Sequence, residues 1–217
     1  MKHLLIIAAC VLAIPTGIRA QAAPVDSLNK DNDFEFRIGG YLLNAERNSS
    51  FNNVPKTGTG NVQGVDFLLR GGGVGISGKS IAGTFAGQPD VVSGDVNLLL
   101  GVPEFSVMAG YGRRALSSTL GTQPFSFYRA GVLMSFAIGG SGIRATLSGA
   151  GYVPQDASTM KIGGEGEGTV IYSPPSLPFF AQFGYRTEVF NTKSGTLTTP
   201  EEVRGIRVGV GIQFGGH

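Results

Sequence analysis

The sequence has one cysteine, two histidines and no tryptophan among its 217 residues. Cys10 lies in an apolar stretch near the start, so the rest of the chain cannot form a disulfide, which excludes a disulfide-stapled secreted domain. His3 and His217 stand at the two ends of the chain. A Ser/His/Asp triad or a histidine-ligated metal needs a histidine inside the fold. We therefore expect no enzyme, no metal and no cofactor.

Charge is also scarce and nearly balanced. The chain has 17 Lys and Arg residues against 15 Asp and Glu residues. Removal of Lys2 and Arg19 with an N-terminal leader would leave 15 of each sign. A nucleic-acid-binding domain needs a basic excess on one face, so we expect no nucleic-acid partner.

The first 20 residues have the layout of a secretory signal peptide. A short basic start precedes the apolar run from Leu4 to Ile14, and cleavage is expected after Ala20 or Ala22. The apolar run is short for a helix that must span a bilayer. Ile7-Ala8-Ala9-Cys10 also fits a lipoprotein box, but the box comes early and apolar residues continue beyond it.

Beyond the signal, apolar residues alternate with small or polar ones. This is the period of a β-strand with two different faces. In the last stretch Ile206, Val208 and Val210 share one face, while Arg207 and Gly209 share the other. The alternation predicts about ten strands, near residues 34–44, 61–70, 74–85, 91–100, 104–115, 125–138, 142–153, 164–172, 179–190 and 202–214.

Short and long connections alternate between these strands, which predicts an up-and-down antiparallel meander. The short turns are glycine- and proline-rich and lie at 71–73, 101–103, 139–141 and 173–178. Longer polar links are expected at 46–60, 86–90, 116–124, 154–163 and 191–201.

The two faces differ in charge. The apolar face has almost none, as a lipid-facing band requires, since Arg or Lys at the bilayer midplane costs about 2–4 kcal/mol. The polar face is predicted to line the lumen, where charges can pair or stay hydrated. Its charged residues are Glu35, Arg37, Asp66, Arg70, Lys79, Asp95, Arg114, Arg129, Arg144, Glu165, Glu167, Arg186, Glu188 and Arg207.

Aromatic residues near the predicted strand ends suggest two belts at the water–lipid interfaces. On the short-turn side the belt would comprise Phe34, Phe36, Phe105, Phe136, Tyr172, Phe179 and Phe214. On the other side it would comprise Phe85, Tyr111, Tyr128 and Phe190.

With these features the chain resembles a small, single-chain bacterial outer-membrane β-barrel protein. Its closing stretch from Arg204 to Phe214 is similar to the terminal-strand signal that the barrel-assembly machinery reads. In that signal a glycine is followed by alternating apolar residues and an aromatic, here Gly205, Ile206, Val208, Val210, Ile212 and Phe214. Three residues, Gly215 to His217, follow the aromatic, whereas in most such proteins the aromatic is last.

The resemblance implies an all-β, up-and-down antiparallel transmembrane β-barrel of about ten strands in the bacterial outer membrane. Eight strands would remain if the 61–85 hairpin stayed outside the membrane. The expected organisation is a signal peptide at 1–20, a periplasmic segment at 21–33 and the barrel domain at 34–217. The partners implied are outer-membrane lipid and, during biogenesis, the barrel-assembly machinery.

The expected function is that of a non-enzymatic structural or surface protein with at most a narrow pore for small solutes. One alternative is a soluble periplasmic or secreted β-barrel that binds a lipophilic ligand, because soluble antiparallel sheets alternate too. Another is a hydrolase that uses the paired carboxylates of Glu165 and Glu167. We favour a structural role for this pair, in which it neutralises lumenal arginines such as Arg144 or Arg186.

One stretch, GVGISGKS at residues 73–80, matches the phosphate-binding loop of nucleotide hydrolases. That loop must open a helix, and residues 80–89 contain two glycines and a proline, which disfavour one. We therefore expect a strand in which Lys79 points into the lumen and meets Asp66 or Asp95, and no nucleotide partner.

Overall fold

A computed structural model describes residues 34–51, 54–118, 121–157, 161–194 and 197–215. The expected signal peptide, the segment 21–33 and His217 lie outside the described residues. Among the described residues, no helix is long and apolar enough to cross a membrane. The strands are β1 (Glu35–Phe51), β2 (Val54–Gly71), β3 (Val74–Phe85), β4 (Gln88–Val102), β5 (Phe105–Ser118), β6 (Gly121–Ile138), β7 (Ile143–Pro154), β8 (Gly163–Tyr172), β9 (Phe179–Ser194) and β10 (Leu197–Gly215).

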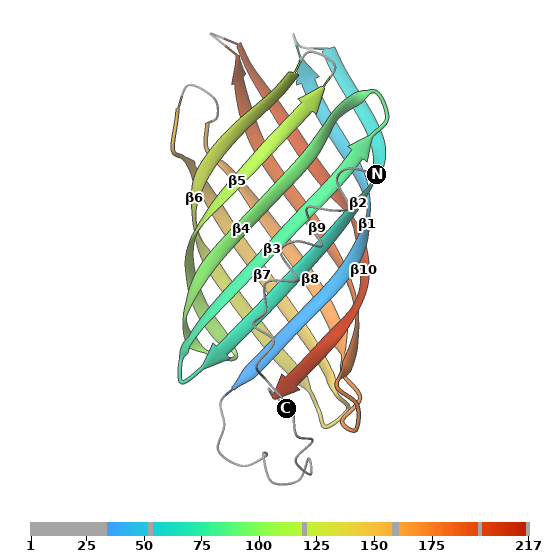
Figure 1. Cartoon of the computed structure of the whole chain (residues 1–217), viewed down its shortest axis with the longest axis vertical. Coiled ribbons are helices and arrows are strands. Elements are labelled where there is room, and N and C mark those ends of the chain that lie inside the picture. The colour runs from blue at the N-terminus through green and yellow to red at the C-terminus, as the bar shows by residue number, and fades with distance from the viewer. Residues whose placement is uncertain (1–33, 52–53, 119–120, 158–160, 195–196, 216–217) are drawn as a thin grey trace, which may run out of the picture. The chain divides into compact units, whose positions relative to one another are not determined.

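These ten strands form one closed antiparallel barrel (Figure 1). Each strand pairs with its sequence neighbours, and β1 closes on β10 in a register that runs from Glu35 opposite Gly215 to Ser49 opposite Glu201. Closure leaves no sheet edge with unpaired backbone groups. The predicted all-β, up-and-down architecture is confirmed.

The strand count depended on the glycine-rich stretch after residue 73. This stretch is β3, which pairs with β2 from Val74 opposite Gly71 to Phe85 opposite Gly60. It also pairs with β4, from Val74 opposite Leu100 to Gly83 opposite Val91. The eight-strand alternative is therefore wrong.

At the end of the barrel where β10 finishes (Figure 1), two residues connect β2 to β3 and β4 to β5, four connect β6 to β7, and six connect β8 to β9. The turn between β2 and β3 places Gly72 and Gly73 at φ values of 59° and 82°, a backbone region that other residues rarely adopt. We call this end of the barrel the short-turn end and the opposite end the hairpin end.

Most residues of the long polar links expected at the hairpin end belong to strands, so this prediction is wrong. β1 and β2 continue to the pair Phe51–Val54, and β9 and β10 continue to Ser194 and Leu197. Only the link from β7 to β8 is a longer connection, between Pro154 and Gly163. The polar stretches form strands rather than loops, because two antiparallel strands keep the hydrogen bonds between them in water.

Side chains alternate between the barrel exterior and its interior, the lumen. Along β4, Val91, Ser93, Asp95 and Asn97 are buried, while Val92, Val96 and Leu98 are exposed. Inward-facing glycines give the larger side chains room in the lumen. The Phe180 ring lies over Gly211, where an added Cβ would meet the Ile38 carbonyl oxygen and come within 2.5 Å of the ring. Glycine is therefore required opposite an aromatic residue in this narrow interior.

Candidate functional site

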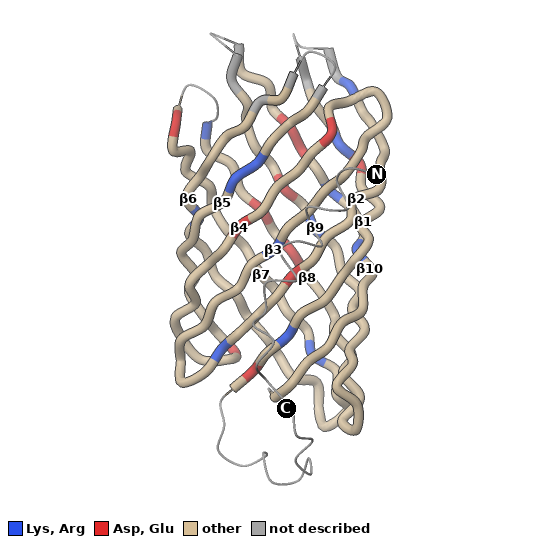
Figure 2. The backbone as a smooth tube through the Cα atoms, viewed as in Figure 1, with Lys and Arg blue, Asp and Glu red and all other residues tan. Residues whose placement is uncertain are grey.

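The most concentrated chemistry of the molecule is a network of charged side chains across the middle of the lumen. Charged residues recur along the barrel strands (Figure 2). The central charge network has five acidic and five basic members, which form two groups of ion pairs, one around Glu165 and one around Arg207: Asp66, Lys79, Asp95, Arg114, Arg129, Glu165, Glu167, Arg186, Glu188 and Arg207. It is balanced in charge, which favours its burial in a low-dielectric interior.

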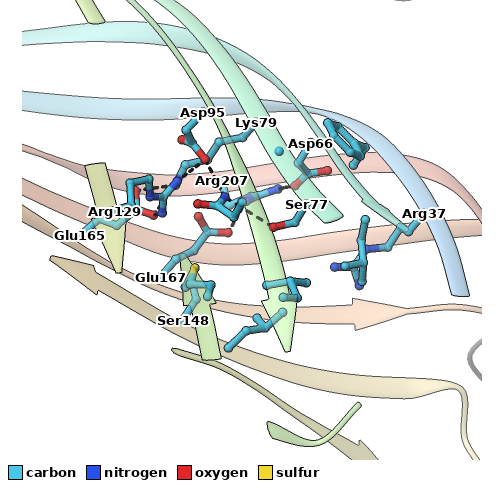
Figure 3. Close-up of a pocket in the computed structure, with 17 residues that line it drawn as sticks. Arg37, Asp66, Ser77, Lys79, Asp95, Arg129, Ser148, Glu165, Glu167 and Arg207 are labelled. Atoms are coloured by element: carbon cyan, nitrogen blue, oxygen red, sulfur yellow. Dashed lines mark hydrogen bonds and ion pairs between the residues drawn. The ribbon is translucent and has the colours of Figure 1, made fainter. Parts of the chain in front are cut away.

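Glu165 on β8 is the centre of this network. Its carboxylate pairs with Lys79 from β3, Arg129 from β6 and Arg186 from β9. The Glu165 side chain is 2% exposed, and the Arg186 guanidinium lies 3.1 Å from it. These contacts tie four strands together through one carboxylate. Glu165 therefore cross-links opposite walls of the barrel (Figure 3).

Tyr152 on β7 links Glu165 to the second carboxylate of the network, Glu188. Its hydroxyl lies 2.6 Å from a Glu165 oxygen and 3.1 Å from a Glu188 oxygen. Glu188 also pairs with Arg114 and, at 3.4 Å, with Arg186. Tyr152 is 2% exposed and was not among the predicted site residues. Its inward position follows from the alternation along residues 142–153, but the two contacts cross between strands.

A second centre of the network is Arg207 on β10. Its guanidinium pairs with Asp66 and Glu167 and donates a hydrogen bond to Gln182 Oε1 at 3.0 Å. It also lies 3.8 Å from the centroid of the Tyr41 ring. The cation thus has acceptors in its plane and a π-face beside it, an arrangement that suits a guanidinium.

Three of the predicted lumen residues gather nearer the short-turn end. Glu35 accepts ion pairs from Arg70 at 2.7 Å and from Arg144 at 3.0 Å. Arg70 also donates to the Pro103 carbonyl in the turn between β4 and β5, at 3.1 Å. This cluster connects the turn between β4 and β5 to β1.

Arg37 has a different environment from the other predicted lumen charges. Its guanidinium lies 5.9 Å from the centroid of the Phe180 ring, and it forms no ion pair with any described residue. In Figure 3 it stands to one side of the network. Arg37 lines a cavity of about 110 Å³ together with Asp66, Lys79, Arg129 and Glu167. That volume is enough for about three water molecules.

Toward the hairpin end the lumen is filled by apolar side chains. They leave a gap of only about 10 Å³ beside Arg114, Arg186 and Glu188. We call this layer the apolar plug; it consists of Leu43, Val62, Ile81, Phe85, Val91 and Val203. All six are 7% exposed or less.

Beyond the apolar plug lies an ion pair that the sequence reasoning missed, Arg47 with Glu201. Arg47 also donates to the Pro89 carbonyl at 2.6 Å, and Thr192 donates to Glu201 at 3.0 Å. Both charged residues fell in segments expected to be loops. The signal that could have found them is the alternation itself, because Arg47 continues the inward row of Leu43 and Ala45.

The structure also changes the expected partner of Lys79. Its register neighbours are Asp66 and Asp95, as anticipated. Its ammonium group, however, contacts Glu165 across the lumen.

Glu165 and Glu167, the pair considered for a hydrolase, are both engaged in ion pairs. Glu165 pairs with Arg186, whereas Arg144 contacts Glu35. Within the described ranges, no group of three or more His, Cys, Asp and Glu side chains could hold a metal ion.

The barrel exterior is an apolar surface. Val96, Phe183, Val208 and Val210 are between 54% and 67% exposed. A continuous apolar band around a closed barrel, with a polar and charged interior, is the arrangement that lipid requires. The chain is an outer-membrane β-barrel. A soluble barrel would leave this band in water, so the soluble alternative is not supported.

The aromatic belts of this outer-membrane barrel are only partly as expected. Phe105, Phe136, Tyr172, Phe179 and Phe214 are exposed on the short-turn side. Tyr111 and Tyr128 are exposed on the other side and contact each other edge to face, with ring centroids 5.9 Å apart. Phe85 and Phe190 were assigned to this second belt, and that is wrong. They are 5% and 1% exposed and point into the lumen, where they fill space.

Comparisons with known proteins find distant structural similarities. No family model and no curated protein sequence matches the chain. The translocator domain of the autotransporter NalP from Neisseria meningitidis has a TM-score of 0.39 and 12% identity, over 98% of this chain and 96% of that one. The CymD monoaromatic hydrocarbon channel has a TM-score of 0.31 and 9% identity, over 85% and 89%. A deltaS2 mutant of the TodX monoaromatic hydrocarbon channel has a TM-score of 0.30 and 7% identity, over 87% and 91%.

Proposed function

We propose that this outer-membrane barrel is a non-enzymatic structural protein whose lumen is closed to solutes. The observation that carries the proposal is the filling of the lumen at successive levels. The central charge network crosses its middle, and the apolar plug leaves a gap of about 10 Å³ above it. A gap of that size is at most that of one water-sized probe.

The cavity beside Arg37 fits the same function. It measures about 110 Å³, and its lining includes Lys79, Arg129 and Glu165 of the central charge network. Small barrels have their interiors filled by side chains, whereas wide barrels keep an aqueous channel. The ion pairs and the apolar plug both add to barrel stability while they close the path.

Uptake of small solutes by proteoliposomes tests this function. The barrel extracted from membranes is reconstituted, and swelling in isotonic solutions of a pentose or of glycine is compared with swelling of protein-free vesicles. We expect equal rates for the two preparations. Faster swelling in the presence of the folded barrel would show that solutes pass and would refute the closed lumen. The fraction of folded barrel is read from its faster migration on an unboiled denaturing gel.

We also propose that β10 is the segment that the barrel-assembly machinery recognises. The row Ile206, Val208, Val210 and Phe214 is 49% to 67% exposed on the lipid face, which supports this role. The test is a Phe214→Ala variant, with Phe179→Ala as a control at a similarly exposed aromatic on the same side of the barrel. We expect the first to lower the yield of folded barrel in membranes more than the second. Equal yields would rule out a special role for the terminal aromatic.

A further inference from the structure

Two exposed arginines, Arg113 and Arg204, lie near the hairpin end. Arg113 on β5 is exposed, and it forms no ion pair with any described residue. Arg204 on β10, which also faces outward near the hairpin end, contacts Glu46 at 3.1 Å and Glu202 at 3.7 Å. Among the described residues, acidic side chains therefore neutralise Arg204 but not Arg113.

The position of Arg113 along the strand sets what it meets. It lies eight residues from Phe105 in the short-turn belt and two residues beyond Tyr111 in the opposite belt. With a rise of about 3.3 Å per residue and a tilt near 40°, Arg113 is about 20 Å above Phe105 along the barrel axis. The apolar band of such barrels is about 25 Å tall. The long side chain can therefore extend from the edge of the band into the headgroup layer.

Beside Arg113 the outer wall is hollowed. The hollow measures about 470 Å³ and is shallow and open to the outside. Small residues at Ser80, Gly94 and Ala115 form it between Val92 and Pro124. Ser80 brings a hydroxyl group to this surface, the Thr122 hydroxyl is hydrogen-bonded to Ser117, and no carboxylate lines the hollow. We call this feature the Arg113 hollow.

We propose that the Arg113 hollow binds the phosphate-bearing headgroup of a membrane lipid. An unpaired guanidinium at the edge of an apolar band needs an anion, and lipid phosphate is the anion available at that depth. The guanidinium binds the phosphate, and Gly94 and Ser80, the register neighbours of Arg113 on β4 and β3, leave room for the headgroup beside it. The site is independent of whether the lumen conducts.

Lipid-selective fluorescence quenching tests the proposal. The chain has no tryptophan, so Tyr128→Trp places one reporter on β6 opposite Tyr111. The full-length barrel is reconstituted in phosphatidylcholine vesicles that contain dibrominated phosphatidic acid or, in a parallel sample, dibrominated phosphatidylcholine. We expect phosphatidic acid to occupy the site about five-fold more favourably, the preference expected of one arginine at a lipid surface. Equal quenching by both lipids would overturn the proposal.

Matched variants in the same reporter background separate the site from general surface charge. Arg113→Gln should abolish the preference, and Arg204→Gln should leave it unchanged. Gly94→Leu should weaken the preference by filling the hollow; an added Cβ there meets only the Lys79 carbonyl oxygen at 3.6 Å, so the variant can fold. Retention of the preference by Arg113→Gln, or an equal loss with Arg204→Gln, contradicts the proposal.

Two further measurements identify the source of the phosphate. A reporter at Phe136→Trp, on the short-turn side of the same strand, should show no lipid preference. Inorganic phosphate added to the buffer should not change quenching by the brominated phosphatidic acid. If it competes, the site takes free phosphate and the lipid assignment is wrong.

Discussion

Replacing Glu165 with glutamine should destabilise the barrel strongly, because this carboxylate is the centre of the ion pairs that cross the lumen. The substitution removes the charge and keeps the size of the side chain. Arg129 and Arg186 keep one carboxylate each, Asp95 and Glu188. Lys79 loses its only ion-pair partner among the described residues while its side chain is 14% exposed.

The expected magnitude follows from this imbalance. Removing one partner of a buried ion pair costs about 3–5 kcal/mol, because the other charge stays buried without compensation. Since two of the three cations keep an acid, we place the loss of unfolding free energy at the lower end, about 3 kcal/mol. Glu202→Gln serves as the control. Its contact with Arg204 is on the exterior, where such pairs contribute about 1 kcal/mol or less.

Equilibrium unfolding in urea measures these values. The reconstituted barrel is incubated at increasing urea, and the folded fraction is read from the fast-migrating band on an unboiled denaturing gel. The double variant Lys79→Met/Glu165→Gln should recover part of the loss, because it removes the stranded ammonium group as well. If Glu165→Gln costs no more than Glu202→Gln, or the double variant equals the sum of the singles, the lumenal pairing argument is refuted.

Two other substitutions test the walls of the barrel. Gly211→Ala should lower the unfolding free energy by about 1–3 kcal/mol in the same urea assay, because the added Cβ meets the Ile38 carbonyl oxygen and the Phe180 ring, whereas Gly94→Ala has space. A cost at Gly94 as large as at Gly211 would show that glycine serves another purpose. Val210→Arg, midway along the lipid-facing row of β10, should cost about 2–4 kcal/mol, and Thr198→Arg near the hairpin end should cost little. Equal effects at Val210 and Thr198 would place the apolar band elsewhere.

The strand count and the division into faces could be predicted from the sequence because both follow from a period of two residues. Val74, Ile76, Gly75 and Lys79 alternate strictly even inside a stretch that matches a nucleotide-binding motif. The same period assigns Phe85 to the lumen, on the face of Lys79. A belt position for Phe85 conflicts with this alternation, which outweighs the tendency of aromatic residues to gather near strand ends.

Strand length and cross-lumen pairing could not be predicted in the same way. Polar runs that contain glycine and asparagine, such as the one around Asn48, suggest loops. They nevertheless pair in register, because they continue the strand pairing that begins in the barrel wall. The contact between Lys79 and Glu165 joins strands that do not pair with each other. Sequence spacing gives neighbours in the sheet, but the width of the lumen decides which charges meet across it.

Single-channel recording tests the closed lumen most directly. The folded barrel is inserted into a planar bilayer in concentrated salt, and current is recorded at both polarities. The account predicts no current steps above the lipid background, because the apolar plug and the central charge network block the path. Reproducible steps whose amplitude increases with salt concentration would show an open water-filled path through the lumen and would contradict it.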